Sequence, residues 1–146
     1  MTNDFKKPEY KDLSILVIDD DVMVTRIVEH ILKDMGFEDV QSTLYPKTGL
    51  ALISDSENMG KPFDLVICDW MMPEISGIEV LKWVRSKNMN LPFIMLTARA
   101  TEDAVEEAHG LDVDAYIAKP FASNQVQLKV STIAQRILRS RHADAE

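Results

Sequence analysis

The sequence is poor in cysteine, in basic residues and in long apolar runs, and each shortage excludes a class of protein. Cys68 is the only cysteine among 146 residues, so no internal disulfide can form and its expected role is core packing. The chain has 16 lysines and arginines against 24 aspartates and glutamates, and the net charge of −8 disfavours nucleic acid as a partner. No apolar run is long enough for membrane insertion, and the amino-terminal residues lack the apolar stretch of a signal peptide. The cytoplasm is therefore the expected location.

What the sequence does contain fits one globular domain. Hydrophobic residues make up 46% of the chain and charged residues 27%, a balance that allows a buried core. Residues 1–11 are polar and include Pro8, so we expect a loose leader there. Residues 142–146 are expected to fray at the end of the last helix, which leaves 12–141 as the folded domain.

The most informative stretch runs from Phe63 to Gly77 and reads FDLVICDWMMPEISG. Its apolar run, residues 65–68, stops at Asp69, a pattern typical of a strand that is buried on both faces. Pro73 and Gly77 then mark a turn. We therefore expect Asp69 at the carboxyl end of a central parallel strand, where open α/β sheets place their chemistry.

Apolar runs alternate with helical patterns along the whole chain. The expected strands cover residues 13–18, 40–44, 65–69, 93–97 and 114–118. The expected helices cover residues 22–35, 46–54, 76–85, 101–109 and 123–141, with a polar loop at 55–62. This alternation predicts an α/β fold of three layers, in which helices cover both faces of a parallel five-stranded sheet. Right-handed crossovers then place the carboxyl ends of all strands at one edge.

Polar and charged residues stand at the carboxyl ends of four of these strands. Three aspartates at 19–21 follow the first strand, Asp69 ends the third, Thr97 ends the fourth and Lys119 follows the fifth. Close carboxylates raise one another's pKa unless a cation neutralises them. Lys119 balances one charge, and the surplus calls for a hard divalent cation with oxygen ligands, such as Mg²⁺. Such a site is suited to stabilising charge on a phosphoryl group, with Asp69 as metal ligand or as nucleophile.

Four motifs together resemble the receiver domain of two-component response regulators, in its stand-alone CheY-like form. They are VIDDD at 17–21, DLVICDWMMPEISG at 64–77, MLTA at 95–98 and AYIAKPF at 115–121. The motifs occur in the family's order and with the family's spacing, and they cover nearly the whole chain. The resemblance implies a (βα)5 flavodoxin-like fold with strand order 2-1-3-4-5.

The resemblance also assigns roles to the acidic residues. Asp69 would be the phosphoacceptor. Asp20, Asp69 and the backbone carbonyl of Met71 would coordinate Mg²⁺, and Asp19 would help, through water. Asp21 lies one position beyond the family's acidic pair, and we expect it to cap the first helix.

The remaining family roles fall on the fourth and fifth strands. Lys119 would pair with the phosphoryl oxygens, and the Lys119–Pro120 peptide bond is expected to be cis. Thr97 would hydrogen-bond the phosphoryl group, and Tyr116 would swing inward as Thr97 moves. Two alternatives remain: Thr97 as a strand-end hydroxyl that caps the next turn, and Tyr116 as a static core aromatic.

The implied function is a phosphorelay switch, which catalyses only its own phosphorylation and dephosphorylation. A sensor histidine kinase or a histidine phosphotransfer protein would donate the phosphoryl group to Asp69. We expect no output domain, so the signal would leave through the fourth helix, fifth strand and fifth helix toward an unknown protein target or a second copy of the chain. Met71 offers no hydrogen bond to an attacking water, and Arg99 could guide an incoming anion. We therefore predict a long-lived phosphoryl group.

Two other interpretations remain open. A phosphatase of the haloacid-dehalogenase type would use Asp19 as the nucleophile and Asp21 as the acid, again with Mg²⁺. The chain is short for that class, and Met23 stands where a small polar or β-branched residue is expected. The other interpretation is an adaptor that keeps the fold without phosphorylation, and the complete set of strand-end residues argues against it.

Overall fold

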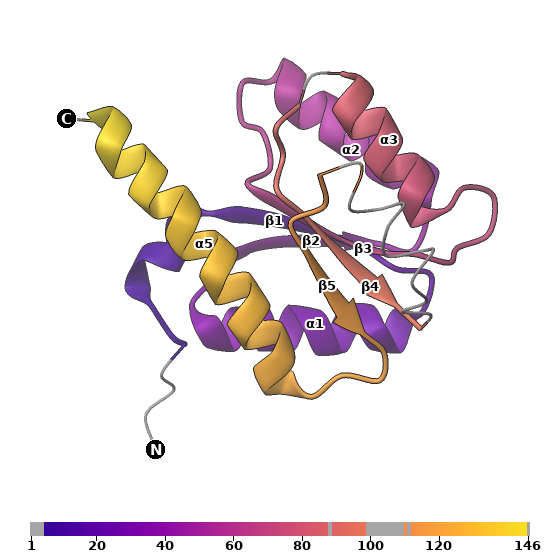
Figure 1. Ribbon diagram of the computed structural model, residues 1–146, viewed down its shortest axis with the longest axis horizontal. Helices are drawn as coiled ribbons and strands as arrows, with labels where there is room; N and C mark the ends of the chain where they lie inside the picture. The colour runs from indigo at the N-terminus through magenta and orange to yellow at the C-terminus, as the bar shows by residue number, and fades with distance from the viewer. Residues whose placement is uncertain (1–4, 88, 99–109, 111, 146) are drawn as a thin grey trace.

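The computed structural model describes residues 5–87, 89–98, 110 and 112–145. Its centre is one sheet of five parallel strands in the order β2-β1-β3-β4-β5 (Figure 1). The strands are β1 (Ser14–Ile18), β2 (Asp39–Thr43), β3 (Leu65–Asp69), β4 (Phe93–Thr97) and β5 (Ala115–Ala118). The predicted flavodoxin-like α/β fold and its strand order are confirmed.

Helices cover both faces of the sheet, and each face has its own apolar core. The helices α1 (Val22–Met35) and α5 (Ser123–Ala145) lie on one face, and α2 (Pro46–Asn58) and α3 (Gly77–Ser86) lie on the other (Figure 1). Alternate residues of β1 supply the two cores, with Val17 on the α1/α5 side and Ile18 on the α2/α3 side. Every residue of β3 and β4 is buried, as their continuous apolar runs predict. Cys68 packs in the α2/α3 core, which is the role expected for it.

The parallel register brings the functional residues to one side of the sheet, which we name the carboxyl edge. Strand β1 leads directly into Asp19, β3 ends at Asp69, β4 ends at Thr97, and Lys119 follows β5. Neighbouring strands remain paired as far as these ends. The side chains predicted to converge are therefore all placed at the carboxyl edge.

The helices that follow β1 and β3 begin at side-chain caps. Asp21 Oδ1 accepts a hydrogen bond from the backbone N–H of Met23 (2.9 Å), which confirms the expected cap of α1. Ser76 and Glu79 form a reciprocal capping box at the start of α3. Gly36 ends α1 with φ of 109°, in the left-handed region that glycine tolerates. These caps fix the helix starts that face the carboxyl edge.

The expected loose leader is wrong for the residues directly before β1. Pro8–Asp12 form a 3-10 helix, η1, and Tyr10 is fully buried. The ring of Tyr10 stacks on Phe37 with 4.6 Å between centroids, and its hydroxyl lies 3.1 Å from Ser131 Oγ and 2.9 Å from Gln135 Nε2 on α5. A buried aromatic ring with a satisfied hydroxyl stabilises this segment, although most of its neighbours in the sequence are polar.

Two helices are longer than predicted. Helix α2 reaches Asn58, where a polar loop was expected from residue 55, and α5 reaches Ala145, where fraying was expected from residue 142. Polar residues do not end a helix by themselves, and an ion pair between Arg141 and Asp64 anchors the last turns of α5. The helix predicted over 101–109, and Arg99, lie outside the described residues. In the part of the chain described here, no helix combines the length and apolar character needed to cross a membrane.

Candidate functional site

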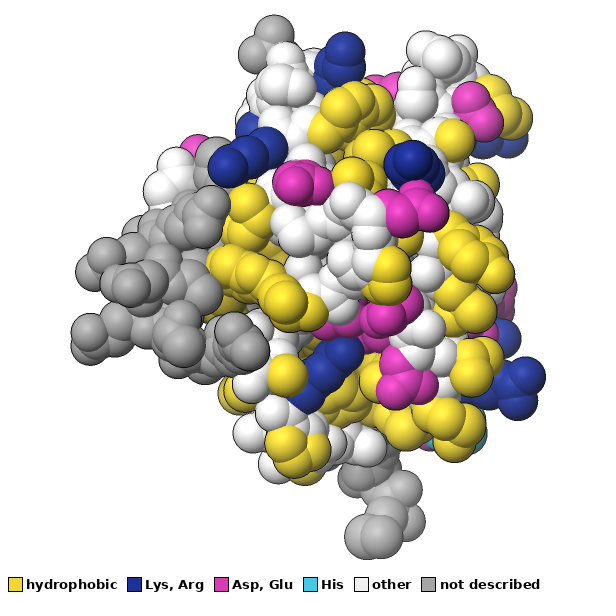
Figure 2. Space-filling model, turned by 90° about the vertical axis from the view of Figure 1, so that its right-hand side faces the viewer, with side chains coloured by type: hydrophobic (Ala, Val, Ile, Leu, Met, Phe, Trp, Pro, Cys, Tyr) yellow, Lys and Arg dark blue, Asp and Glu magenta, His cyan; other side chains and the backbone are white. Residues whose placement is uncertain are grey.

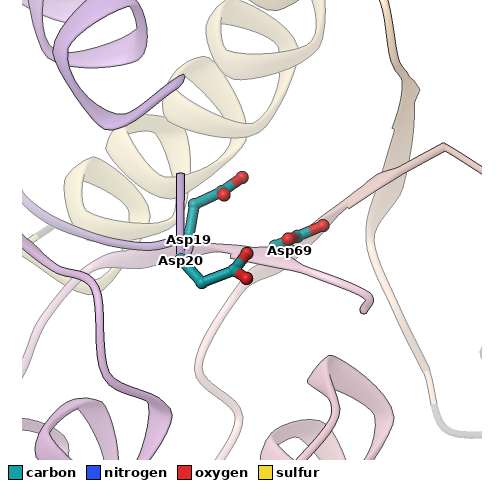
Figure 3. Close-up of side chains that lie close together, drawn as sticks. All are labelled: Asp19, Asp20 and Asp69. Carbon is teal, nitrogen blue, oxygen red and sulfur yellow. The ribbon is translucent and has the colours of Figure 1, made fainter. Parts of the chain in front are cut away.

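Three carboxylates meet at the carboxyl edge. Asp19 and Asp20 follow β1 and Asp69 ends β3, and one oxygen from each lies within 4.8 Å of the other two (Figure 3). Asp19 is 0% exposed and Asp69 is 5% exposed, whereas Asp20 is exposed. Figure 2 looks onto this side of the molecule, where acidic side chains gather near the middle and hydrophobic side chains surround them. The cluster is therefore open to solvent on the side of Asp20.

Lys119 supplies the positive charge of the site. Its Nζ lies 2.8 Å from Asp19 Oδ2 and 3.1 Å from Asp69 Oδ1, so the ammonium bridges the two buried carboxylates. The second oxygen of Asp19, Oδ1, accepts a hydrogen bond from the backbone N–H of Asp21 (2.9 Å). The Lys119–Pro120 peptide bond is cis, as the resemblance implied. Both oxygens of Asp19 are thus engaged, while Asp69 shares the lysine.

The carboxylates and the lysine shift one another's protonation. Burial, and then the charge of Asp19, raise the pKa of the Asp69 carboxyl to about 6, against the lowering effect of Lys119. Burial lowers the pKa of Lys119, but its hydrogen bond with Asp19 and the charges of Asp19 and Asp69 outweigh this effect, so that this pKa is raised. Lys119 therefore stays charged at neutral pH, where Asp69 is mostly ionised. Charged groups that perturb one another in this way are common at functional sites.

The donor set fits a hard divalent cation such as Mg²⁺. Three carboxylates face one ammonium, which leaves a surplus of negative charge when all are ionised. Mg²⁺ prefers oxygen ligands and keeps several of its waters, and the exposed side near Asp20 leaves room for them. Because both oxygens of Asp19 already accept hydrogen bonds, a water-mediated role suits Asp19 better than direct coordination. Asp20 and Asp69 are then the side chains available for direct contact.

The backbone after Asp69 turns sharply through contacts with β4 and α3. The N–H of Trp70 donates to the Leu96 carbonyl (2.8 Å), and the N–H of Gly77 donates to the Trp70 carbonyl (2.8 Å). A Cβ atom at Gly77 would lie only 2.2 Å from the carbonyl oxygen of Asp69, so only glycine fits there. This role of Gly77 was not predicted from the sequence, although a glycine at the first position of a helix was an available signal. The Met71 side chain is 56% exposed, and the metal contact of its carbonyl stays a prediction.

Thr97 and Tyr116 occupy neighbouring strands behind the cluster. Thr97 is 1% exposed at the end of β4. Tyr116 is paired with Met95 in the β4–β5 register, is half-buried and packs against the α2/α3 core. Burial raises the pKa of Tyr116. Thr97 thus lies at the carboxyl edge, whereas Tyr116 lies two residues before the end of β5, and the switching roles of both stay predictions.

Known proteins are similar to this chain in sequence and in fold. Residues 15–131 match the response regulator receiver domain family. The chain is 34% identical over 129 residues to the chemotaxis protein CheY-3 of Vibrio cholerae serotype O1, covering 87% of this chain and 95% of that protein. It is 32% identical over 127 residues to the chemotaxis protein CheY of Pseudomonas aeruginosa, covering 86% of this chain and 98% of that protein. The receiver domain of the Francisella response regulator 1452 superposes with a TM-score of 0.76 at 29% identity, covering 85% of this chain and 98% of that domain.

Proposed function

Because the chain belongs to the response regulator receiver domain family, and is therefore a two-component response regulator, we propose that Asp69 accepts a phosphoryl group from a histidine of a partner protein. The donor would be a sensor histidine kinase or a histidine phosphotransfer protein. The observation that carries the proposal is the position of Lys119 Nζ, 2.8 Å from Asp19 and 3.1 Å from Asp69. An ammonium held there can bind the oxygens of a phosphoryl group attached to Asp69.

The acidic cluster is proposed to hold Mg²⁺. Asp20, Asp69 and the backbone carbonyl of Met71 would be its direct ligands, and Asp19 would contact it through water. When bound, Mg²⁺ supplies charge neutralisation for the phosphoryl oxygens. Without a divalent cation, the same carboxylates repel an incoming phosphoryl group, so phosphorylation should depend on Mg²⁺.

The transfer step uses the carboxylate form of Asp69. With a pKa of about 6, this carboxyl is mostly ionised at neutral pH. One of its oxygens forms a bond to phosphorus while the phosphorus–nitrogen bond of the phosphohistidine breaks, and the electron pair leaves with the imidazole. Lys119 remains protonated and neutralises the charge that spreads over the phosphoryl oxygens. The product is an acyl phosphate on Asp69.

Dephosphorylation is proposed to be slow. Water attacks the acyl phosphate, which restores the carboxylate of Asp69 and releases inorganic phosphate. Met71, two residues after the acceptor, is exposed but apolar, and it offers no hydrogen bond to orient that water. A dephosphorylation half-life of seconds would contradict this part of the proposal.

The signal is proposed to be a shift between two populations of the protein. The phosphoryl group would bind the Thr97 hydroxyl and Lys119 better in the active arrangement, and Tyr116 would follow Thr97 inward. A change from mostly inactive to mostly active requires roughly 5 kcal/mol of such preference. New charge-assisted hydrogen bonds, at about 1.5–3 kcal/mol each, can supply it. The receiving surface would include β5 and α5, and its partner would be a protein target or a second copy of the chain.

The phosphatase interpretation fits the site less well. Asp19, its required nucleophile, is 0% exposed and has both oxygens hydrogen-bonded. Asp21, its required acid, accepts the capping hydrogen bond of α1. An assay with generic phosphomonoesters separates the two interpretations, because a receiver domain should show no turnover.

The test is a titration of Mg²⁺ and beryllofluoride, a phosphoryl mimic, followed by tryptophan fluorescence. Trp70 adjoins the acceptor and should report occupancy, while Trp83 on α3 gives background. We expect a saturable, Mg²⁺-dependent change in the native protein that disappears in Asp69→Ala. It should persist in the control Asp55→Ala, which alters an exposed aspartate of α2. If the fluorescence of the native protein does not change and calorimetry detects no metal binding, the phosphorylation proposal is wrong and the adaptor interpretation is favoured.

A further inference from the structure

A cavity of about 490 Å³ lies at the amino-terminal edge of the sheet, opposite the carboxyl edge. We name it the amino-edge cavity. Its walls come from the residues directly before β3 and β4 and from the last turns of α5, which project beyond the sheet (Figure 1). The volume is within the range of small-molecule sites. Four of its lining residues come from α5 and lie outside the stretch that matches the receiver family: Arg136, Ile137, Ser140 and Arg141.

The lining divides into an apolar part and a basic part. Phe63 and Leu91 are 7% and 6% exposed, and Ile137 adds a half-buried aliphatic side chain from α5. Arg136 and Arg141 line the same cavity with guanidinium groups whose side chains are 55% and 52% exposed. An apolar wall with a few directed polar groups is the usual composition of a small-molecule site.

Both arginines are paired with half-buried aspartates. Arg136 Nη2 lies 2.6 Å from Asp114 Oδ1, and Arg141 Nη2 pairs with Asp64 Oδ1. The second oxygen of each aspartate accepts a backbone N–H at the start of a strand, from Phe93 and Ser14 respectively, both at 2.8 Å. The aspartates are therefore fixed by the sheet, and they position the guanidinium groups before any ligand arrives. Such preorganisation lowers the entropy cost of binding.

Each guanidinium retains donors for a ligand. A guanidinium carries five N–H donors, and in the contacts among described residues each of the two uses one nitrogen. Planar paired donors match a carboxylate or phosphate group. Glu57 and Asp64 also line the cavity, so its formal charge is balanced and binding would depend on directed hydrogen bonds more than on net charge.

We propose that the amino-edge cavity binds a small organic anion with an apolar group, the anion on Arg136 and Arg141 and the apolar group against Phe63, Leu91 and Ile137. This site is separate from the acidic cluster, because it lies at the opposite edge of the sheet. Its occupancy does not require Mg²⁺ or a phosphorylated Asp69. Failure of one proposal therefore leaves the other intact.

The probe is 4-phenylbutyrate, which joins a carboxylate to an aromatic ring, and its matched control is the neutral 4-phenylbutyramide. We titrate each into the isotope-labelled full chain and follow the backbone amide signals of Phe63, Leu91 and Ile137. Saturable shifts are expected with a dissociation constant of about 1 mM or lower, and the amide should bind at least about tenfold more weakly. The double substitution of Arg136 and Arg141 by glutamine should weaken binding by a similar factor. Arg139→Gln, on the same helix but away from the cavity, should not change it.

A cavity-filling variant keeps the test decisive if the double substitution unfolds the protein. Ser140→Phe places a ring at an exposed lining position and leaves both arginines in place. It should abolish binding of the probe. The proposal is overturned if the native chain shows no saturable shift up to about 10 mM. Equal binding of the amide, or unchanged affinity in Ser140→Phe, would overturn it as well.

Discussion

The substitution Asp69→Asn should stabilise the fold at neutral pH in the absence of divalent cations, even though the proposed function depends on Asp69. Burial, and then the charge of Asp19, raise the pKa of this carboxyl to about 6 from an ordinary 3.8. Between these two values the native state binds more protons than the unfolded state. Because the folded pKa is the higher one, the native protein loses stability as the pH rises through this window.

The size of the effect follows from the shift. The raised pKa of Asp69 lowers the free energy of unfolding of the native protein by about 3 kcal/mol near pH 7.5. Near pH 4 this cost is less than about 1 kcal/mol. The neutral amide avoids this cost, and the pKa of about 6 already includes the favourable contact between the carboxylate and Lys119. Asp69→Asn should therefore raise the free energy of unfolding by about 3 kcal/mol near pH 7.5 and by less than about 1 kcal/mol near pH 4.

Urea unfolding with EDTA present, followed by tryptophan fluorescence at both pH values, measures this difference. Asp55→Asn on α2 is the matched control, and it should stay within about 0.5 kcal/mol of the native protein. Addition of Mg²⁺ should narrow the difference near pH 7.5, because the cation binds the native carboxylates more tightly than those of the variant. If Asp69→Asn were less stable than the native protein near pH 7.5, or gained equally at both pH values, the reasoning about the buried carboxylate would be refuted.

Three further predictions concern stability. Gly77→Ala should lower the free energy of unfolding, measured with urea, by about 2 kcal/mol or more, because its Cβ would lie 2.2 Å from the carbonyl oxygen of Asp69. A decrease of less than about 0.5 kcal/mol would show that the turn relaxes to accept the methyl group. Lys119→Met should cost about 3–5 kcal/mol at neutral pH, because Asp19 would remain buried without its cation; unchanged thermal stability would contradict this. Tyr10→Phe should lower the free energy of unfolding by about 1–3 kcal/mol and speed amide hydrogen exchange in α5, because two hydrogen bonds to that helix are lost. Unaltered exchange would mean that η1 does not stabilise α5.

The fold was predictable because its signals are local and repeated. Strands β3 and β4 are continuous apolar runs, and each stops at a polar residue, Asp69 and Thr97 respectively. In a parallel sheet the strand direction alone decides which ends share an edge. The convergence of Asp19, Asp69 and Lys119 was therefore predicted without any knowledge of distances.

The errors arose where a residue's partners are distant in the sequence. Tyr10 stands in a mostly polar segment, and its partners Phe37 and Gln135 lie 27 and 125 positions away. Gly77 was interpreted as a turn residue, because its close approach to the Asp69 carbonyl exists only after α3 has folded back. Neither contact has a periodic signature, so neither could be predicted from hydrophobic patterns.

By itself the sequence determined the parallel α/β architecture, the residues at the carboxyl edge and the cap of α1 by Asp21, because periodicity and strand order suffice for these features. Only the tertiary structure decided that Lys119 bridges Asp19 and Asp69, that Asp19 is buried while Asp20 is exposed, and that the end of α5 lines the amino-edge cavity. These features depend on the burial and relative position of side chains up to 100 residues apart, which packing sets and local pattern does not encode.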